Sequence, residues 1–306
     1  MKIALKIDVD TLRGTLEGVP RLVDLCARFN ADATFLFSLG PDHTGRALRR
    51  AFRPGFFSKV ARTSVLEHYG LKTCLYGTLL PGPDIGRRGA DVMRSVLDRG
   101  FEVGIHCFDH VKWQDNVTSS DGVWTVAQLR AAHERFIEIF GEPARVHGAA
   151  GWQMNAQAFL AEDLLGYTHA SDTRGISPFF PRVAGRTLEC LQLPTTLPTL
   201  DELIGRTDLG ADPVAHLLNL TEAREEEAHV YTLHAELEGQ RLLPWFERLL
   251  DGWRAQGYGF TSLAGLRQSM KRTEVPVREI EYGRVPGRSG TLALASTSSF
   301  GIVPCH

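Results

Sequence analysis

Two histidines with a spacing of four residues are the first chemical feature of this sequence. His106 and His110 follow a short apolar stretch, 101–105, that is typical of a buried strand. At this spacing both imidazoles point to one side of a helical turn or turn-like loop, so they can bind the same metal ion. Asp10 is the third ligand that we expect, because two imidazoles and one carboxylate leave positions open for water and substrate. The alternative is a chance pair on a solvated helix face.

Two aspartates, Asp8 and Asp10, lie on either side of Val9 where the first apolar stretch of the chain ends. In an extended strand, residues two positions apart face the same side, so both carboxylates point in one direction. Adjacent carboxylates repel each other unless a cation lies between them or one of them is protonated. We therefore expect Asp10 to bind the ion and Asp8 to accept a proton from water. The alternative is a pair of turn or helix-capping aspartates.

His234 follows another apolar stretch, 230–233, and precedes the acidic residues Glu236 and Glu238. A histidine at a strand end that faces the metal ligands can protonate a leaving amine, and this is the role that we expect. Glu236 or Glu238 either orients this histidine or binds a cationic product. The alternative is that both carboxylates are solvated at the surface.

Small residues precede Trp152 in the sequence, at Ala150 and Gly151. Small side chains let a substrate approach the backbone closely. We expect a backbone N–H of Ala150, Gly151 or Trp152 to stabilise the oxyanion of amide hydrolysis. The Trp152 ring either lies against a sugar or packs in the core.

Apolar stretches of strand length alternate with helix-period stretches along most of the chain, which is typical of βα units. The predicted strands are 3–7, 34–39, 101–105, 145–149, 167–171, 188–193, 230–233 and 258–261. The predicted helices are 19–29, 90–99, 126–140, 213–225 and 243–255. The loops that follow the strands of a barrel meet on one face, so a barrel brings the candidate catalytic and metal-binding residues together better than a doubly wound sheet does. We therefore predict an α/β fold in the form of a distorted (β/α) barrel of about seven strands.

Composition indicates one large globular domain. The chain has 306 residues, 43% of them hydrophobic. Its net charge of −2 gives no overall attraction to nucleic acid, and we find no nucleic-acid recognition module. Five scattered cysteines without a Cys-x-x-Cys pair favour a reducing compartment. Asp8 interrupts the first apolar stretch, and nothing approaches the roughly 20 apolar residues of a spanning helix. We therefore expect a cytoplasmic protein.

The stretch 41–85 separates the second predicted strand from the next helix by far more than an ordinary loop. Basic and aromatic residues alternate in it at a helix-compatible spacing, which is typical of a segment on an anionic lipid surface. The expected membrane contacts are Arg49, Arg50, Arg53, Phe56 and Phe57. The alternative is a solvated basic subdomain whose aromatic side chains pack inward.

After Lys271 the chain is rich in Gly, Ser, Pro and Thr, a composition typical of a frayed tail. We therefore place the barrel in residues 1–270, with 41–85 as an insertion that forms a helical segment. Residues 271–306 are a C-terminal extension in this division.

The aspartate pair, the histidine pair and the later Leu233-His234 together resemble the motifs of the polysaccharide deacetylase family. An aspartate after the fifth predicted strand, Asp172, belongs to the same resemblance. The family resemblance implies a distorted seven-stranded (β/α) barrel that binds one divalent ion. It implies Asp8 as the base, His234 as the acid and the other three residues as metal ligands.

Within that family the chain is similar to the deformylases of a formylated aminoarabinose that is linked to a polyprenyl phosphate. The similar stretches are 7–11, 17–22, 149–152, 171–175, 194–199, 234–239 and 287–290. This resemblance implies release of formate and a free aminosugar at the inner face of the cytoplasmic membrane. The aminosugar then serves the modification of lipid A that gives resistance to polymyxin and other cationic peptides. The similarity at 287–290 counts against a frayed tail.

The chain departs from the wider family in one motif. Many polysaccharide deacetylases have an arginine after the fourth strand that orients the base, whereas this chain has Gly151-Trp152-Gln153-Met154. We expect Arg174 to take that role, directly or through Asp172. The alternative is an ordinary surface ion pair.

Other functions are compatible with the same residues. One is an N-deacetylase of another glycan, or a cyclic amide hydrolase, with the same metal centre. Another is a non-catalytic carbohydrate-binding barrel, but mere binding needs neither a base nor an acid beside the ligands. Zinc, manganese, cobalt and iron all suit two histidines and a carboxylate, so the identity of the metal stays open.

Overall fold

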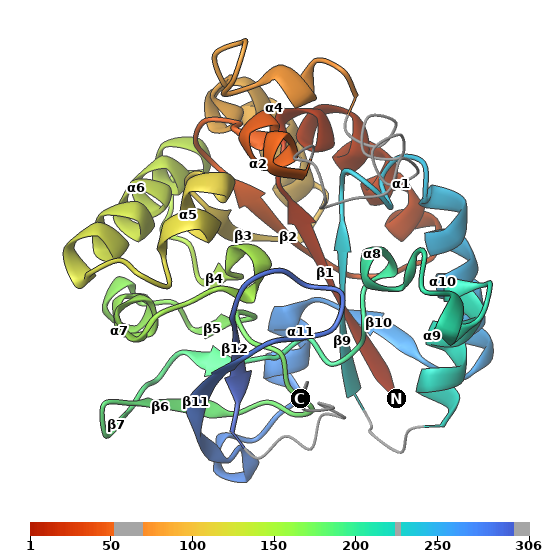
Figure 1. The fold of residues 1–306 in the computed structure, drawn as a ribbon. Helices are drawn as coiled ribbons and strands as arrows, with labels where there is room; N and C mark the ends of the chain where they lie inside the picture. Colours follow the sequence, from red (N-terminus) through yellow and green to blue (C-terminus); the bar gives the residue numbers. More distant parts are fainter. Residues whose placement is uncertain (52–69, 224–227, 297–306) are drawn as a thin grey trace.

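The computed structural model describes residues 1–51, 70–223 and 228–296, without the side chains of 48–51 and 207. Its centre is a sheet in which every pair of neighbouring strands is parallel (Figure 1). The strands are β1 (Lys2–Val9), β2 (Thr34–Ser38), β3 (Glu102–Cys107), β4 (Val146–His147), β5 (His169–Ala170), β8 (Leu191–Gln192), β9 (Ala228–His234) and β10 (Gly259–Thr261). From β1 the order runs β2, β3, β4, β5 and β8, while β9 pairs along β1 and β10 pairs with its first residues.

The sheet closes irregularly between β8 and β9. The backbone N–H groups of Thr196 and Leu197 both donate to the carbonyl of Val230 in β9, at 3.1 and 3.4 Å. These two bonds stand where a regular barrel would have a full strand ladder. The expected distorted (β/α) barrel is therefore confirmed.

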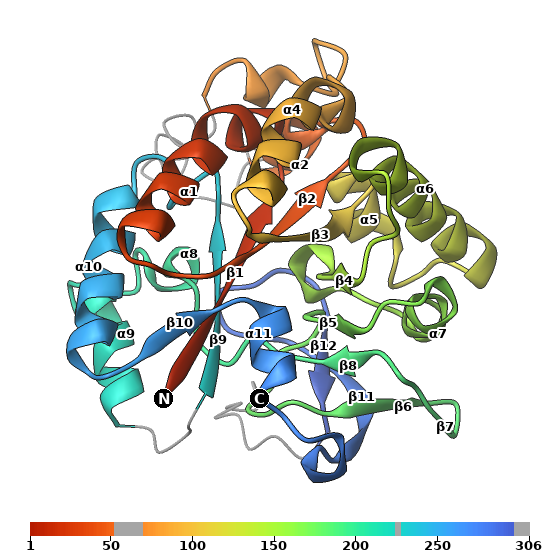
Figure 2. The same ribbon diagram turned by 180° about the vertical axis from the view of Figure 1, so that it is seen from behind.

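Helices cover the outside of the sheet (Figures 1 and 2). They are α1 (Val19–Arg28), α4 (Ile85–Asp98), α6 (Gly122–Phe140), α7 (Ala156–Leu165), α9 (Pro213–Glu222) and α10 (Leu243–Ala255). A further helix, α11 (Leu263–Gln268), instead packs Leu263 and Leu266 against the apolar cluster inside the barrel. Shorter helices are the π-helical η1 (Gly14–Gly18), α5 (His110–Asn116), η3 (Ala150–Trp152), α8 (Leu200–Leu203), η4 (Thr207–Leu209) and η5 (Arg272–Glu274).

Alternation along β1 divides the core in two. Ile3, Leu5 and Ile7 belong to the large apolar cluster that includes the buried faces of the helices. Ala4 belongs instead to a cluster that fills the inside of the barrel, with residues from β2, β4 and β9. Because side chains alternate along a strand, Lys6 and Asp8 continue the inward row of Ala4. Polar groups therefore replace apolar ones inside the barrel toward the end of β1.

A second sheet lies beside the barrel and contains the C-terminal part of the chain. Its order is β12 (Leu292–Ala295), β11 (Val277–Gly283), β6 (Phe180–Val183) and β7 (Arg186–Thr187). The loop between β11 and β12 runs across the front of the barrel toward α8 (Figure 1). Composition alone is misleading here, because pairing with β6 orders a segment whose residues by themselves suggest fraying.

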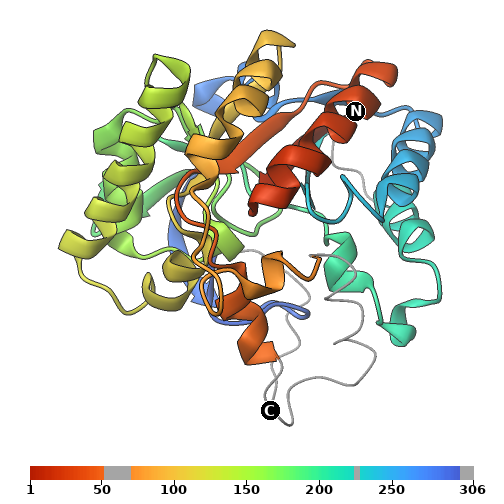
Figure 3. The same cartoon turned by 90° about the horizontal axis from the view of Figure 1, so that it is seen from above.

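The long segment after β2 contains α2 (Thr44–Ala51) and η2 (Thr73–Leu75), and an isolated bridge between Pro41 and Asp84 brings its ends together. Figure 3 shows α2 on the same side of the molecule as the β11–β12 loop. Arg53, Phe56 and Phe57, three of the expected membrane contacts, lie outside the described residues, as do the side chains of Arg49 and Arg50. Within the described residues, no helix combines the length and the apolar character needed to cross a membrane.

Candidate metal centre and active site

Asp10, His106 and His110 meet at the ends of β1 and β3. The Nε2 atom of His106 lies 3.2 Å from Asp10 Oδ1, and that of His110 lies 3.5 Å from Asp10 Oδ2. One potential ligand atom from each residue falls within 4.8 Å of the other two. His106 is on β3, while His110 is the first residue of α5, so a strand end and a helix start together produce the convergence.

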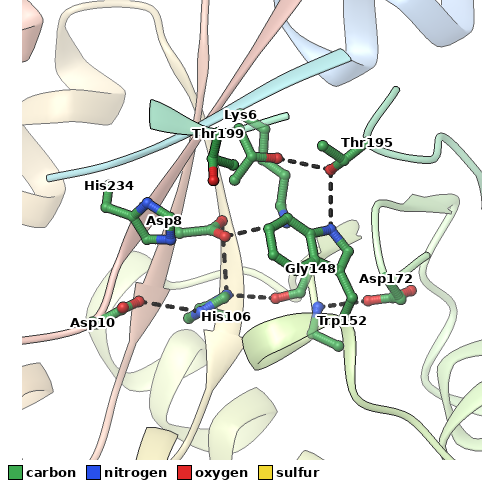
Figure 4. Close-up of polar contacts among 12 residues, drawn as sticks. Lys6, Asp8, Asp10, His106, Gly148, Trp152, Asp172, Thr195, Thr199 and His234 are labelled. Carbon is green, nitrogen blue, oxygen red and sulfur yellow. Dashed lines mark hydrogen bonds and ion pairs between the residues drawn. The ribbon is translucent and has the colours of Figure 1, made fainter. Parts of the chain in front are cut away.

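The donor set fits a divalent cation. His106 Nδ1 donates to the Gly148 carbonyl at 2.5 Å, which turns Nε2 toward Asp10 (Figure 4). Asp10 Oδ1 is buried without a hydrogen-bond partner in the described part of the chain. Burial favours the neutral acid, but the His110 and His106 imidazoles hold the pKa of Asp10 below its ordinary value. One carboxylate and two imidazoles are a donor set that suits a catalytic metal site.

Asp8 lies next to this cluster, deeper in the barrel. Its side chain is 4% exposed, and Oδ1 is 3.8 Å from His106 Nδ1. The other oxygen, Oδ2, is 3.2 Å from the amine of Lys6. Asp8 is therefore held beside the three potential ligands, with one oxygen paired to a cation and the other without a hydrogen-bond partner among the described residues.

His234 is the last residue of β9, and Asp8 pairs with it in the β1–β9 register. Its Nδ1 is 3.9 Å from Asp201 Oδ1, and its backbone N–H donates to Glu238. Burial alone would lower the pKa of His234, but the charges of Asp201, Asp10 and Glu238 raise it. Its surroundings therefore favour the imidazolium, the form that can give a proton away.

A cavity of about 200 Å³ joins these groups. Its walls include the residues that the sequence predicts for the metal and proton transfer: Asp8, Asp10, His106, His110 and His234. Other wall residues come from α2, the Gly151 loop, α8 and the β11–β12 loop. The structure thus brings all five predicted residues to one cavity, although the individual roles stay predictions.

The comparison with curated proteins gives the family. Over 297 residues the chain is 33% identical to the probable 4-deoxy-4-formamido-L-arabinose-phosphoundecaprenol deformylase ArnD of Shewanella sediminis (strain HAW-EB3). The match covers 95% of this chain and 94% of that protein. The chain belongs to this deformylase family. The protein of the same name from Wigglesworthia glossinidia brevipalpis is 28% identical over 281 residues, which are 92% of this chain and 97% of that one.

Solved structures confirm the fold of this deformylase family member. The crystal structure of a proposed polysaccharide deacetylase from Mycobacterium smegmatis superimposes on this chain with a TM-score of 0.62 at 15% identity. The match covers 93% of this chain and 95% of that one. At this identity the likeness concerns the fold alone. No protein-family model matches the chain.

Glu236 supports the first strand of this deformylase fold rather than facing a ligand. Its Oε1 atom accepts hydrogen bonds from the backbone N–H groups of Asp10 and Thr11 and from the Thr11 hydroxyl, at 2.8–2.9 Å. The carboxylate is buried, which corrects the alternative of a solvated surface residue. Glu238 is also buried, and it accepts a hydrogen bond from the backbone of His234 instead of from its ring. Within the described residues, the hydrogen bonds of Glu236 thus come from the backbone and the Thr11 hydroxyl, and that of Glu238 comes from the backbone. These bonds do not support the predicted role of either glutamate in orienting the imidazole.

The loop after β4 lines the cavity through Gly151 and Trp152. The φ of Gly151, +63°, suits a residue without a side chain. The Trp152 N–H already donates to the Ala149 carbonyl at 3.0 Å, which leaves Ala150 and Gly151 as the better oxyanion candidates. The Trp152 ring is 1% exposed and donates through Nε1 to the Thr195 hydroxyl at 3.0 Å. Trp152 is thus buried and also lines the cavity, so both alternatives for its ring stay predictions.

Asp172 and Arg174 do not orient Asp8, and this corrects the sequence prediction. Asp172 Oδ1 accepts from the Ala149 N–H at 2.7 Å and lies 2.8 Å from His147 Nδ1, so it supports the loop after β4. Arg174 forms bridges to the β12 region and pairs with Glu202 at 2.6 Å. That backbone pairing directs the guanidinium to Glu202 instead of Asp8.

Three residues of the site were missed by sequence reasoning: Lys6, Asp201 and Arg288. The alternation Lys6-Ile7-Asp8 carries a usable signal, because it places the amine on the same side as the carboxylate. Asp201 lies in a Thr-x-x-Glu capping box, a pattern that indicates only a helix start. Arg288 belongs to the stretch 287–290 that resembles the deformylases, but the sequence does not show its approach to the cavity, which depends on the second sheet.

Proposed function

We propose that this chain hydrolyses the formamide of undecaprenyl-phosphate-linked 4-deoxy-4-formamido-L-arabinose, which gives formate and the free aminosugar. The observation that carries the proposal is one cavity with a buried carboxylate, Asp8, and an imidazole, His234, beside the three potential metal ligands. The deformylase relatives supply the substrate. The product amine is the group that lipid A modification requires, and so the proposal extends to resistance against cationic peptides.

A formamide resists water because resonance weakens the carbonyl as an electrophile and the nitrogen as a leaving group. When a divalent ion is bound by Asp10, His106 and His110, it supplies Lewis acidity to both the carbonyl and the attacking water. Asp8 accepts the proton of that water on Oδ1, the oxygen without a hydrogen-bond partner among the described residues. Lys6 keeps Oδ2 occupied.

The departing nitrogen needs a proton, and His234 is placed to give it. The carboxylates around His234 favour its protonated form, so the proton is available before the carbon–nitrogen bond breaks. A backbone N–H of Ala150 or Gly151 donates to the developing oxyanion, an interaction typically worth about 3 kcal/mol. Glu236 holds the backbone of Asp10 in place during both steps.

The decisive experiment offers the purified protein the formylated lipid-linked aminosugar and, separately, an N-acetylated sugar. We expect formate release that Asp8→Ala and His106→Ala each abolish, with His216→Ala as a control outside the site. Release of acetate without formate would favour a deacetylase of another glycan. Binding of either sugar without any turnover would instead indicate a non-catalytic carbohydrate-binding barrel.

The metal requirement is tested by removing the ion with a chelator and restoring zinc, manganese, cobalt or iron one at a time. We expect activity to disappear and then return with one or more of these ions. Asp10→Asn and His110→Ala should each lower the metal content of the purified protein, measured by elemental analysis. Full activity after exhaustive chelation would contradict the proposed metal centre.

We also propose that the chain works at the inner, anionic face of the cytoplasmic membrane, as its lipid-linked substrate requires. Support comes from the sequence of the 41–85 segment, with Arg49, Arg50, Arg53, Phe56 and Phe57 as the contacts. Replacing both phenylalanines with Ser should weaken co-sedimentation with anionic vesicles and leave the melting temperature unchanged. Equal sedimentation of the variant and the parent would contradict this docking.

A further inference from the structure

Lys6 is a lysine with no exposed surface, on the inward row of β1 and inside the barrel. A charged amine loses much of its hydration there, a cost that a protein tolerates when the charge is paired. The nearest acidic group is Asp8, whose Oδ2 lies 3.2 Å from the Lys6 amine. Because Lys6 and Asp8 are two residues apart on one strand, the strand itself fixes their approach.

The surroundings of Lys6 make room for this approach. Gly148 has no side chain, and a Cβ atom there would lie 2.8 Å from Lys6 Cε and 2.3 Å from the side chain of Leu36. The Lys6 amine also lies 5.0 Å from the centre of the Trp152 ring, whose face attracts a cation (Figure 4). The space left by Gly148 and the face of the ring thus place the amine beside the Asp8 carboxylate, with which it forms an ion pair rather than a hydrogen bond within the described residues.

Two other cations face the Trp152 ring, Arg174 at 4.9 Å and Arg288 at 4.6 Å. Arg174 pairs with Glu202, and Arg288 pairs with Glu202 and Asp201. Of these three cations, Lys6 is the one that forms an ion pair with Asp8. Lys6 on the first strand therefore makes the contact with Asp8 that many polysaccharide deacetylases make with an arginine after the fourth strand, and that the sequence analysis expected of Arg174.

We propose that Lys6 is the positioning residue of the catalytic base. By binding Oδ2, it fixes the rotation of the Asp8 carboxylate and leaves Oδ1 on the side of His106, 3.8 Å from its Nδ1. The inference rests on the proposed amide hydrolysis for its kinetic consequence. Its structural claim, that Lys6 sets the orientation of Asp8, is independent of which substrate is cleaved.

The kinetic test compares Lys6→Met, Lys6→Arg and Lys2→Met in the metal-loaded protein. Met keeps the volume of Lys6 without the charge, and Lys2→Met is a matched control because Lys2 is exposed on the same strand. We expect Lys6→Met to lower kcat about 100-fold with KM nearly unchanged, since a misplaced base affects the transition state and not substrate binding. Lys6→Arg should recover most of kcat. A Lys6→Met variant with the parent's kcat, or a Lys6→Arg variant as slow as Lys6→Met, would overturn the proposal.

A crystal structure of Lys6→Met, or of Lys6→Gln if the Met variant does not fold, gives a readout other than activity. We expect the Asp8 carboxylate to rotate away from its parent position while the metal content per chain stays the same. An unmoved carboxylate would overturn the proposal whatever the kinetics. If the parent protein releases neither formate nor acetate, the proposed function fails, and the rotation of Asp8 still decides the role of Lys6.

Discussion

The Gly148 carbonyl accepts the Nδ1 proton of His106 at 2.5 Å, so a glycine of one strand end determines which nitrogen of a candidate ligand faces the metal site. The same glycine leaves space for the Lys6 side chain. One residue without a side chain thus supports both the ligand and the neighbour of the proposed base. Any side chain at this position has to displace Leu36 or Lys6.

Gly148→Ala should therefore affect stability and metal binding together. The added Cβ would lie 2.3 Å from Leu36 Cδ1 and 2.8 Å from Lys6 Cε, and overpacking of this kind costs about 1–3 kcal/mol. Denaturant unfolding and metal titration measure the two effects. Gly259→Ala is the matched control, because among the described residues no other atom would come within 4 Å of a Cβ added there. A Gly148→Ala protein that matches this control in both measurements would contradict the packing argument.

Asp201 should set the pH at which activity declines on the alkaline side. The proposed acid, His234, works only when protonated, so the rate falls as the pH rises through its pKa. Among the charges that raise the pKa of His234, that of Asp201 has the largest effect. Asp201→Asn should therefore lower the pKa of His234 and move the alkaline decline of the rate to lower pH. The measurement is kcat/KM against pH, with the exposed Asp208→Asn as control. If the rate of Asp201→Asn declines at the same alkaline pH as that of the parent, Asp201 does not control the pKa of the catalytic acid.

Much of this site was predictable because strand ends place residues without the help of distant contacts. Asp8, His106 and His234 each follow or end an apolar stretch, and parallel strands in a barrel bring such positions to one face. The predicted helix 243–255 coincides with α10, where the apolar period and the start at Leu243-Pro244 are both strong signals. Local pattern and global fold agree at these positions.

Arg174 shows where such reasoning fails. It follows a predicted strand as the correctly placed residues do, but the chain after β5 pairs with the β12 region and takes the guanidinium to Glu202. Arg288 is the converse case, because only the pairing of β11 with β6 brings it to the cavity. Both outcomes depend on contacts between distant segments, which span 28 residues for Arg174 and Glu202 and 86 residues for Arg288 and Glu202. No local pattern encodes such contacts.

His147 should make the fold sensitive to alkaline pH. Burial alone would lower the pKa of His147, but the Asp172 and Glu162 carboxylates raise it from 6.5 to about 10. A pKa raised by folding contributes stability that is complete below the ordinary value of 6.5 and is lost as the pH rises through about 10. The free energy of unfolding should therefore fall over that range.

The test of this cluster is denaturant unfolding of the parent and of His147→Gln at several pH values. His147→Gln leaves the buried Asp172 carboxylate, which lies beside Glu162, without its cation, a change that costs about 3–5 kcal/mol near neutral pH. The difference between the two proteins should shrink as the pH approaches 10. His216→Gln, a half-buried histidine elsewhere, is the control. A difference that is constant with pH would show that His147 is not protonated in the folded chain.

Arg288 should be the residue that ties the C-terminal segment to the active site. Its guanidinium donates to Glu202 and to the Thr199 hydroxyl at 2.6 Å and to Asp201 at 3.0 Å, and the side chain is 16% exposed. Arg288→Met leaves Glu202 and Asp201 with less compensation, so we expect a loss of about 3 kcal/mol in the free energy of unfolding.

The same variant should free the β11–β12 loop from the cavity wall, because its anchoring bonds to α8 disappear. Hydrogen exchange at 284–291 should then accelerate, and kcat should fall as Asp201 loses the partner that holds it near His234. Arg284→Met is the matched control, an exposed arginine of the same loop. The opposite outcome is faster exchange in the loop of Arg288→Met with an unchanged kcat. It would show that Arg288 does not position Asp201 for catalysis, and that the Thr199 capping box at the start of α8 sets the position of Asp201 instead.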